Sequence, residues 1–197
     1  MKKFEISVLI AFLICSLACL YQLPFSVTCN ELRKDTVRLH VVANSDFEED
    51  QEVKLCVRDA ILEQTDNTLF DASSRADVLA DIEQNLDAFE EIAKEVLRKK
   101  GFDYGARAYV VDMFFDQRSY GGITMPAGEY TALRIELGEA SGKNWWCVLY
   151  PSLCVPSVSR REIETALGGD ETQLLMEDTK YEIRFKIEEL FQNLFNR

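Results

Sequence analysis

The sequence has one histidine, four prolines and nine glycines among its 197 residues. A single imidazole excludes a zinc site built on several histidines. So few prolines and glycines, with no internal repeat or low-complexity stretch, exclude a fibrous chain and do not favour disorder. Basic residues are scarce too, with 22 Lys and Arg against 34 Asp and Glu. This acidic balance argues against nucleic acid or anionic lipid as a partner, because both favour basic patches.

The composition, with 47% hydrophobic and 28% charged residues, is that of a globular protein. Lys2 and Lys3 precede an apolar run from residue 6 to residue 20. A basic start followed by such a run predicts a signal peptide or membrane anchor over residues 1–28. The working part of the protein is therefore expected outside a cytoplasmic membrane.

The N-terminal segment can be processed in more than one way. Ser16-Leu17-Ala18 offers a small-x-small cleavage site, and lipidation of Cys19 is an alternative. After this segment we expect a polar linker over residues 29–35 and one α+β domain over residues 36–197.

Hydrophobic periodicity predicts the elements of that domain. Strands are expected over residues 36–43, 106–115, 130–137 and 144–150, and helices over 46–64, 73–100, 157–169 and 183–195. The last three strands are expected to form an antiparallel meander, with a hairpin-like turn at 138–142. The fold class is α+β, an antiparallel sheet of about four strands covered by helices in a two-layer sandwich.

Three local signals place helix ends. Ser45 with Glu48 three residues later predicts a capping box at the start of the first helix of the domain. Ser73 or Ser74 can cap the second helix, and Gly101 is placed to end it.

Two cysteines bracket a short loop near the second half of the chain. In an oxidising compartment, Cys147 and Cys154 can form a disulfide, which would stabilise the fold by on the order of 2–3 kcal/mol. Cys56 lies on an apolar helix stripe and is expected to be a small core residue.

No residue pattern predicts catalysis or metal binding. His40 and Ser45 are five residues apart along a strand and around a corner, which is poor geometry for a base and its nucleophile. The acidic run from Asn44 to Asp50 resembles the start of a calcium loop, but Glu49 and Leu55 stand where such a loop needs glycine and a bidentate glutamate. We therefore predict no enzyme, no metal and no cofactor, and keep an exported cell-wall hydrolase with a carboxylate pair as an alternative.

Both tryptophans lie in one predicted strand. Trp145 and Trp146 are adjacent, so their side chains point to opposite faces of the sheet. One can anchor the core while the other serves as a binding anchor, or both can be core residues.

Several blocks of the sequence closely resemble stage II sporulation protein R. The match covers roughly residues 36–197, in blocks that include Arg38-Leu39-His40-Val41-Val42-Ala43-Asn44-Ser45-Asp46, Glu49-Asp50-Gln51-x-x-Lys54, Tyr120-Gly121-Gly122, Pro126-Ala127-Gly128-Glu129-Tyr130, and Asn144-Trp145-Trp146-Cys147 through Cys154.

The resemblance implies a signal rather than a catalyst. Family members are made in the forespore and exported into the space between the forespore and mother-cell membranes. There they activate a membrane-embedded aspartic protease of the mother cell, which cleaves the inactive sigma-E precursor. As another alternative function, the chain could be a structural domain of the spore envelope. The membrane contact is expected only through the N-terminal segment.

A partner-binding surface can be suggested on this basis. Tyr120, Gly121 and Gly122 form a short aromatic and glycine segment, and one of Trp145 and Trp146 is expected to be exposed. Aromatic anchors beside a loop are typical of binding surfaces, so we expect the surface around Tyr120, Gly121 and Gly122 and the exposed member of the Trp145/Trp146 pair to contact the protease.

Overall fold

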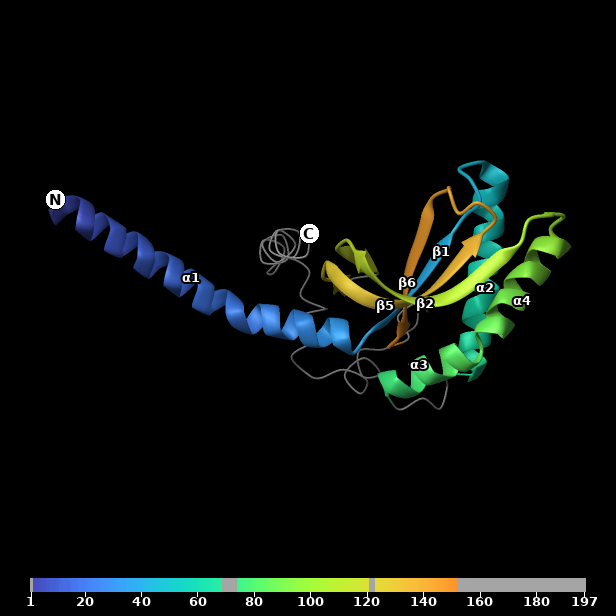
Figure 1. Ribbon diagram of the computed structural model, residues 1–197, viewed down its shortest axis with the longest axis horizontal. Coiled ribbons are helices and arrows are strands. Elements are labelled where there is room, and N and C mark those ends of the chain that lie inside the picture. Colours follow the sequence, from blue (N-terminus) through green and yellow to red (C-terminus); the bar gives the residue numbers. More distant parts are fainter. Residues whose placement is uncertain (1, 69–73, 121–122, 152–197) are drawn as a thin grey trace. The chain divides into compact units, whose positions relative to one another are not determined.

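The structure is a computed structural model that describes residues 2–68, 74–120 and 123–151 (Figure 1). Its elements in chain order are α1 (Lys2–Lys34), β1 (Val37–Val42), α2 (Glu48–Thr68), α3 (Arg75–Gln84), α4 (Leu86–Lys99), β2 (Ala106–Phe115), β3 (Arg118–Tyr120), β4 (Ile123–Met125), β5 (Gly128–Leu137) and β6 (Asn144–Tyr150). The helices expected over 157–169 and 183–195 lie outside the described residues. The α+β class is confirmed.

The chain falls into two compact units. The described part of the first unit holds α1 and the 116–128 segment, in which β3 and β4 form a two-stranded antiparallel sheet. The second unit holds β1, the helices α2 to α4, β2, β6 and β5 from Glu129 onward.

The four-stranded sheet of the second unit has the order β2-β5-β1-β6. The strand β1 pairs in parallel with β5, Leu39 lying opposite Leu133, and antiparallel with β6, Leu39 lying opposite Cys147. The sheet is therefore mixed, and the expectation of an antiparallel meander was wrong.

The order differs because β1 is inserted between two strands that follow each other in sequence. All six residues of β1 are buried, as befits a central strand covered on both faces. The 138–142 segment was expected to close a hairpin between β5 and β6. It instead crosses the end of β1, where Ser141 N donates to Asn44 O (3.1 Å) and Gly142 N donates to Ala43 O (3.0 Å).

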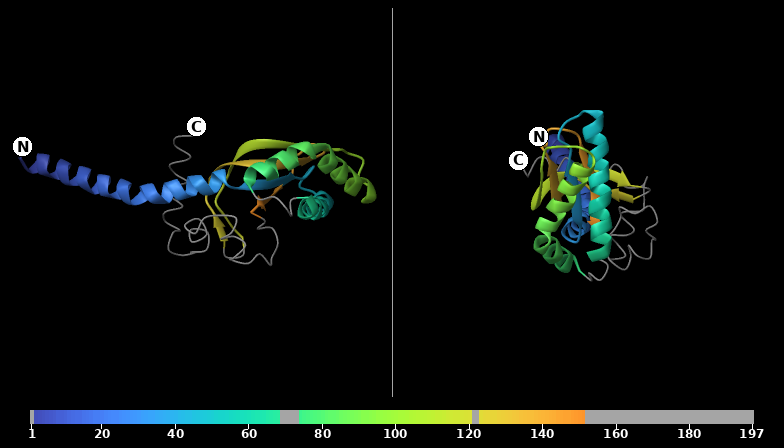
Figure 2. Two further views of the ribbon diagram at one scale, coloured as in Figure 1. Left: turned by 90° about the horizontal axis from the view of Figure 1, so that it is seen from below. Right: turned by 90° about the vertical axis from the view of Figure 1, so that its right-hand side faces the viewer.

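The helices α2, α3 and α4 pack on one face of this sheet, and α2 and α4 run side by side (Figure 2). Each strand contributes alternate residues to the shared core, and each helix contributes residues three or four positions apart. The core consists of Val37, Leu39, Val41, Val53, Val57, Ile61, Val78, Ile82, Phe89, Ala93, Leu97, Ala106, Leu133, Ile135, Leu137, Cys147 and Leu149.

The helix expected over 73–100 is two helices, α3 and α4, that meet at Asn85. The backbone of Asn85 leaves the helical region (φ −111°, ψ 16°), and its side-chain Nδ2 donates to Asp81 O (2.7 Å). An asparagine side chain that bonds the preceding turn competes with the helix, which explains the break.

Two of the three predicted helix ends are confirmed. Ser74 is the N-cap of α3 and accepts from Asp77 N (3.2 Å). Gly101 follows the C-cap of α4 with φ +85°, and the bond from Phe102 N to Leu97 O (3.0 Å) closes a Schellman-type end. The capping box at Ser45 was wrong, because Ser45 Oγ bonds Phe47 N and Asp50 while the helix begins at Glu48.

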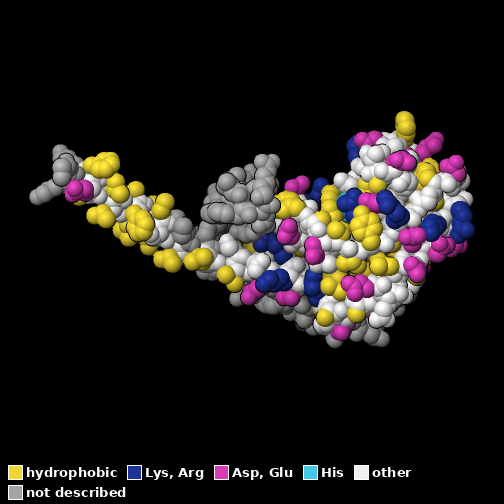
Figure 3. All heavy atoms as spheres, viewed as in Figure 1, with side chains coloured by type: hydrophobic (Ala, Val, Ile, Leu, Met, Phe, Trp, Pro, Cys, Tyr) yellow, Lys and Arg dark blue, Asp and Glu magenta, His cyan; other side chains and the backbone are white. Residues whose placement is uncertain are grey.

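The helix α1 includes residues 30–34, which we expected to form a linker. Its first two thirds expose apolar side chains, among them Phe4, Leu13 and Leu20 (Figure 3). Among the described residues, no helix has both the length and the apolar character needed to cross a membrane.

The last part of α1 differs from its start because one side of it is buried. Phe25, Cys29, Leu32 and Arg33 recur at helical spacing and are each at most 6% exposed. Arg33 Nε donates to Ala127 O (3.0 Å), which fixes this end of α1 to the 116–128 segment of the same unit. The end of α1 is therefore part of the folded protein.

Candidate functional site

The turn between β1 and α2 is organised around a buried carboxylate. Asp50 is 5% exposed and accepts hydrogen bonds from Asn44 Nδ2 (2.9 Å), Ser45 Oγ (2.5 Å) and Tyr104 Oη (2.5 Å). Burial works to raise the pKa of Asp50, but these donors outweigh it and hold the pKa below its usual value. The Asp50 carboxylate is thus ionised, and its three hydrogen bonds stabilise the turn.

A second set of bonds ties this turn to the segment before β6. Lys54 Nζ donates to Gln51 Oε1 (2.6 Å) and to Lys143 O (3.0 Å), and Lys143 N donates to Asp46 Oδ1 (2.8 Å). Burial lowers the pKa of Lys54 more than the charge of Asp46 raises it. The two loops therefore form one bonded end of the sheet, which we call the turn network: residues 44–54, 104 and 138–143.

Two glycines allow the loops to approach this closely. A Cβ on Gly142 would lie 2.1 Å from Ser45 O, and a Cβ on Gly138 would lie 2.1 Å from Asn44 Oδ1. Gly138 also has φ +55°, a conformation that other residues rarely adopt.

The face of the sheet opposite the helices carries a buried layer of cationic and aromatic side chains. Arg38 is fully buried; its Nε donates to Cys147 O (2.9 Å), and its guanidinium lies 4.5 Å from the Phe115 ring centroid and 4.9 Å from that of Tyr130. The ring of His40 stacks on Trp146 with centroids 4.0 Å apart. Cation–π contacts and stacking replace water around these groups.

His40 is positioned by β6 and not by the turn that follows β1. Its Nε2 lies 2.9 Å from Asn144 Oδ1. Burial lowers the pKa of His40 to about 4, although the bond to Asn144 acts in the opposite direction. His40 is therefore neutral at pH 7. The structure does not bring it together with Ser45, whose hydroxyl donates to Asp50.

A charged cluster lies on the same face of β5. Glu136 accepts from Arg107 (2.8 Å), Tyr109 (2.8 Å) and Arg134 (3.0 Å). Burial works to raise the pKa of Glu136, but Tyr109 and the two arginines outweigh it and lower the pKa. Like Asp50, Glu136 accepts hydrogen bonds from side chains of the same unit and so helps to hold the fold together.

The predicted partner-binding residues fall in both units. Trp145 and Trp146 lie in β6 and point to opposite faces, as expected: Trp145 packs on the helix-side core beneath Arg58 (4.3 Å to the ring centroid), and Trp146 stacks on His40. Both are half-buried. The backbone of Tyr120 ends β3 in the first unit, and Gly121 and Gly122 lie outside the described residues. Their role in binding stays a prediction.

The structure describes only one of the two cysteines that we predicted to form a disulfide. Cys147 is disulfide-bonded. Cys154 lies outside the described residues, so the pairing of the two stays a prediction. Cys56 is half-buried and, like the exposed Cys15, has a free thiol.

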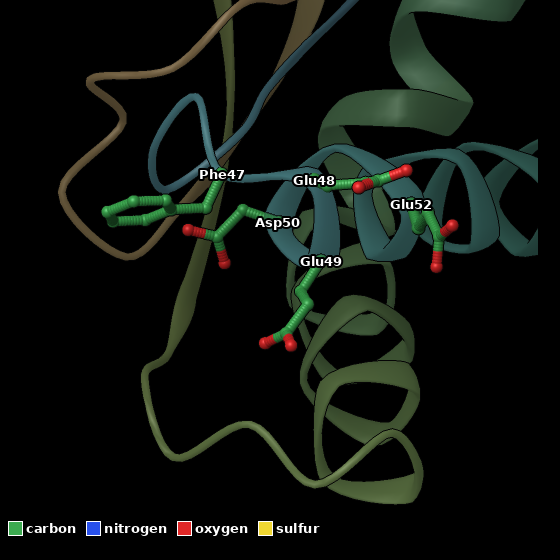
Figure 4. A pocket seen from close by; sticks show the side chains of 5 residues that line it. All are labelled: Phe47, Glu48, Glu49, Asp50 and Glu52. Atoms are coloured by element: carbon green, nitrogen blue, oxygen red, sulfur yellow. The ribbon is translucent and has the colours of Figure 1, made fainter.

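Phe47 and the acidic residues after it border a hollow of about 430 Å³ at the start of α2 (Figure 4). Its lining consists of Phe47, Glu48, Glu49, Asp50 and Glu52. In the described ranges, no three His, Cys, Asp or Glu side chains are arranged to hold a metal ion. The sequence pattern placed Glu48 in a capping box and did not single out Phe47, although a phenylalanine between Asp46 and Glu48 at a turn is a visible signal.

The comparisons with known proteins agree with the motifs. The sequence profile described as stage II sporulation protein R matches residues 33–160, which is more than half of the chain. The chain belongs to the stage II sporulation protein R family. Stage II sporulation protein R of Bacillus subtilis (strain 168) is 34% identical over 147 residues, 72% of this chain and 66% of the relative. The chain thus spans slightly less than two thirds of that relative. No solved structure matches.

The family match assigns the chain to a group of sporulation proteins, and that name is not one of an enzyme family. Many residues that carried the resemblance lie in the turn network. Asn44, Ser45, Asp50, Gln51 and Lys54 bond one another or the 143 backbone. The Asn-Trp-Trp-Cys block supplies the strand that positions His40 and Arg38. These motif residues build the scaffold of the second unit.

Proposed function

We propose that the chain is an exported signalling protein of endospore formation. It crosses the forespore membrane through its N-terminal segment and activates a membrane-embedded aspartic protease of the mother cell, which then cleaves the inactive sigma-E precursor. The observation that carries this proposal is the family match over residues 33–160. The basic start and apolar run of α1 support export.

A protein ligand activates an enzyme only by binding its active arrangement more tightly than its resting one. A rigid ligand is suited to this task because little conformational entropy is lost on binding. The turn network and the buried cationic–aromatic layer support such rigidity in the second unit, because Asp50 and Arg38 are both held by contacts within it. This arrangement supports a ligand more than a catalyst.

Export into an oxidising space accounts for the cysteines. We propose that Cys147 pairs with Cys154 after export and that the apolar start of α1 directs export. Mass spectrometry of the exported protein under non-reducing conditions would find the peptides of Cys147 and Cys154 linked. Two separately alkylated peptides would contradict the pairing.

The activity is tested by deleting the coding sequence in the native sporulating host. The precursor of sigma-E is expected to remain uncleaved, and the full chain should restore cleavage. A variant lacking residues 2–20 should not restore it, although immunoblotting should find it inside the forespore. Normal precursor cleavage in the deletion strain would contradict the proposal and favour the cell-wall or spore-envelope alternatives.

A further inference from the structure

Phe47 is the most exposed large apolar side chain in the described part of the chain, at 78% exposed. Every other large apolar side chain of similar exposure in the described residues belongs to α1. In the described part of the second unit, the other large apolar side chains are therefore buried or half-buried. A single exposed apolar residue is common on protein surfaces, so its setting decides whether it matters.

The backbone of Phe47 is held on both sides. Its N–H donates to Ser45 Oγ (3.2 Å), and its carbonyl accepts from Gln51 N (3.0 Å). Ser45 is itself fixed by its bond to the buried Asp50. The aromatic ring thus projects from a rigid turn and not from a mobile loop, which reduces the entropy lost when a partner binds it.

Three exposed glutamates, Glu48, Glu49 and Glu52, line the same hollow as Phe47, and Glu48 and Glu52 extend to the side opposite its ring (Figure 4). Within the described residues, none of them forms an ion pair. Their position in the first two turns of α2 stabilises the helix through its dipole. That stabilisation explains the carboxylates but gives no reason for a projecting phenylalanine among them.

We propose that Phe47, together with Glu48, Glu49 and Glu52 of the same hollow, is a docking surface for a protein that offers an apolar pocket with Lys or Arg at its edge. The inference rests on the proposed function, in which that partner surface is the extracytoplasmic part of the protease. Burying an aromatic ring in a desolvated pocket supplies most of the affinity of many interfaces. Opposite charges around the pocket orient the encounter and raise the association rate.

The test uses the full chain added to vesicles that carry the protease and the sigma-factor precursor. The Phe47→Ser variant is expected to raise the half-activating concentration at least about tenfold, while saturating cleavage stays near the wild-type level. Phe47→Tyr, which keeps the ring, should change it by less than about threefold. Because the side chain is 78% exposed, both variants should unfold at the wild-type temperature.

The charge contribution is tested with matched triple variants. E48Q/E49Q/E52Q is expected to raise the half-activating concentration at low salt, and the difference should shrink as salt screens the charges. E83Q/D87N/E129Q removes the same number of charges from exposed positions of α3, α4 and β5 that form no ion pair among the described residues, and it should have little effect.

The outcomes separate the inference from the proposed function. No cleavage with the wild-type chain, when the protease is competent, overturns the function itself. Activation by Phe47→Ser at the wild-type concentration overturns the docking surface and leaves the function standing. If Trp146→Ala or Tyr120→Ala weakens activation while Phe47→Ser does not, the docking surface lies elsewhere.

Discussion

Asp50 is the residue on which the turn network most depends. Three side chains, from the turn after β1 and from the segment before β2, donate to it. Removing the charge leaves these donors without an ionised acceptor in a site that is nearly closed to water.

Asp50→Asn is therefore expected to lower the free energy of unfolding by roughly 2–4 kcal/mol. The control is Glu49→Gln at the neighbouring exposed position, which should change stability by less than about 0.5 kcal/mol. Chemical denaturation followed by tryptophan fluorescence measures both. Equal stability of the two variants would show that Asp50 has no special role.

The lowered pKa of His40 makes the free energy of unfolding depend on pH between about 6.5 and 4. Its pKa is lowered from 6.5 to about 4, so between these values the unfolded chain binds a proton that the folded chain does not. Stability is complete above pH 6.5 and falls as the pH drops toward 4, by about 3 kcal/mol at most. Asp50 and Glu136, whose pKa values are lowered from 3.8 and 4.5, lose their contributions as the pH falls below these values, so the loss from Glu136 begins at the acid end of the His40 window.

Because the chain has one histidine, an NMR titration of the imidazole reports on His40 alone. No change in its chemical shift is expected between pH 8 and pH 6. A midpoint near 6.5 in the folded protein would mean that the ring is hydrated and not stacked on Trp146.

At the level of elements, β1 and the 138–143 segment determine the sheet. The segment crosses the end of β1 and returns the chain as β6 on its far side. The backbone of Gly142 comes so close to Ser45 in this crossing that an added Cβ would lie 2.1 Å from Ser45 O.

Gly142→Ala is expected to lower stability by more than about 2 kcal/mol, because the new Cβ meets backbone and not a movable side chain. Gly105→Ala is the matched control, since a Cβ there would meet no atom within 4 Å. It should change stability by less than about 1 kcal/mol. The unfolding temperatures of the two variants test this prediction. Equal temperatures would show that the backbone leaves room for a Cβ at residue 142.

The two parts of α1 should respond differently to mutation. Phe25 is 4% exposed and Leu23 is 56% exposed. Phe25→Ala should therefore destabilise the protein by roughly 3–5 kcal/mol or make the end of α1 sensitive to protease, whereas Leu23→Ala should do neither. Limited proteolysis followed by mass spectrometry locates the change. Equal resistance in both variants would mean that this end of α1 is not part of the fold.

Most elements could be predicted from periodicity, because each strand and helix shows its buried face locally. The position of β1 could not. Arg38 and His40 alternate with Leu39 and so predict an outward polar face, yet both are buried beneath aromatic side chains from β2, β5 and β6. Such pairing depends on residues about 75 to 110 positions away, which no local pattern reveals. The break at Asn85 was missed because the apolar stripe continues across it.

The candidate surfaces were predicted less well than the elements. The Trp145-Trp146 pair was identified, but both rings are half-buried and contribute to the packing of the sheet. Phe47 was passed over, because periodicity identifies buried residues and says little about an exposed one at a turn.

At the scale of the whole molecule, the chain has a hydrophobic N-terminal helix and a second unit in which the buried Asp50 and Arg38 are hydrogen-bonded within the unit. The whole chain has a net charge of −12, which argues against anionic lipid as a partner and is consistent with the basic protein surface that we propose. A family match over most of the chain gives the biological setting, and the exposed turn at Phe47 gives a specific place for contact.

We propose that the protein acts as a ligand from the outside of the mother-cell membrane. The most direct test supplies the purified chain to one side or the other of sealed vesicles that carry the protease and its precursor substrate. The account predicts cleavage that rises and saturates when the protein is on the extracytoplasmic side, and none when it is on the opposite side. Equal cleavage from both sides, or none from either with a competent protease, would contradict it.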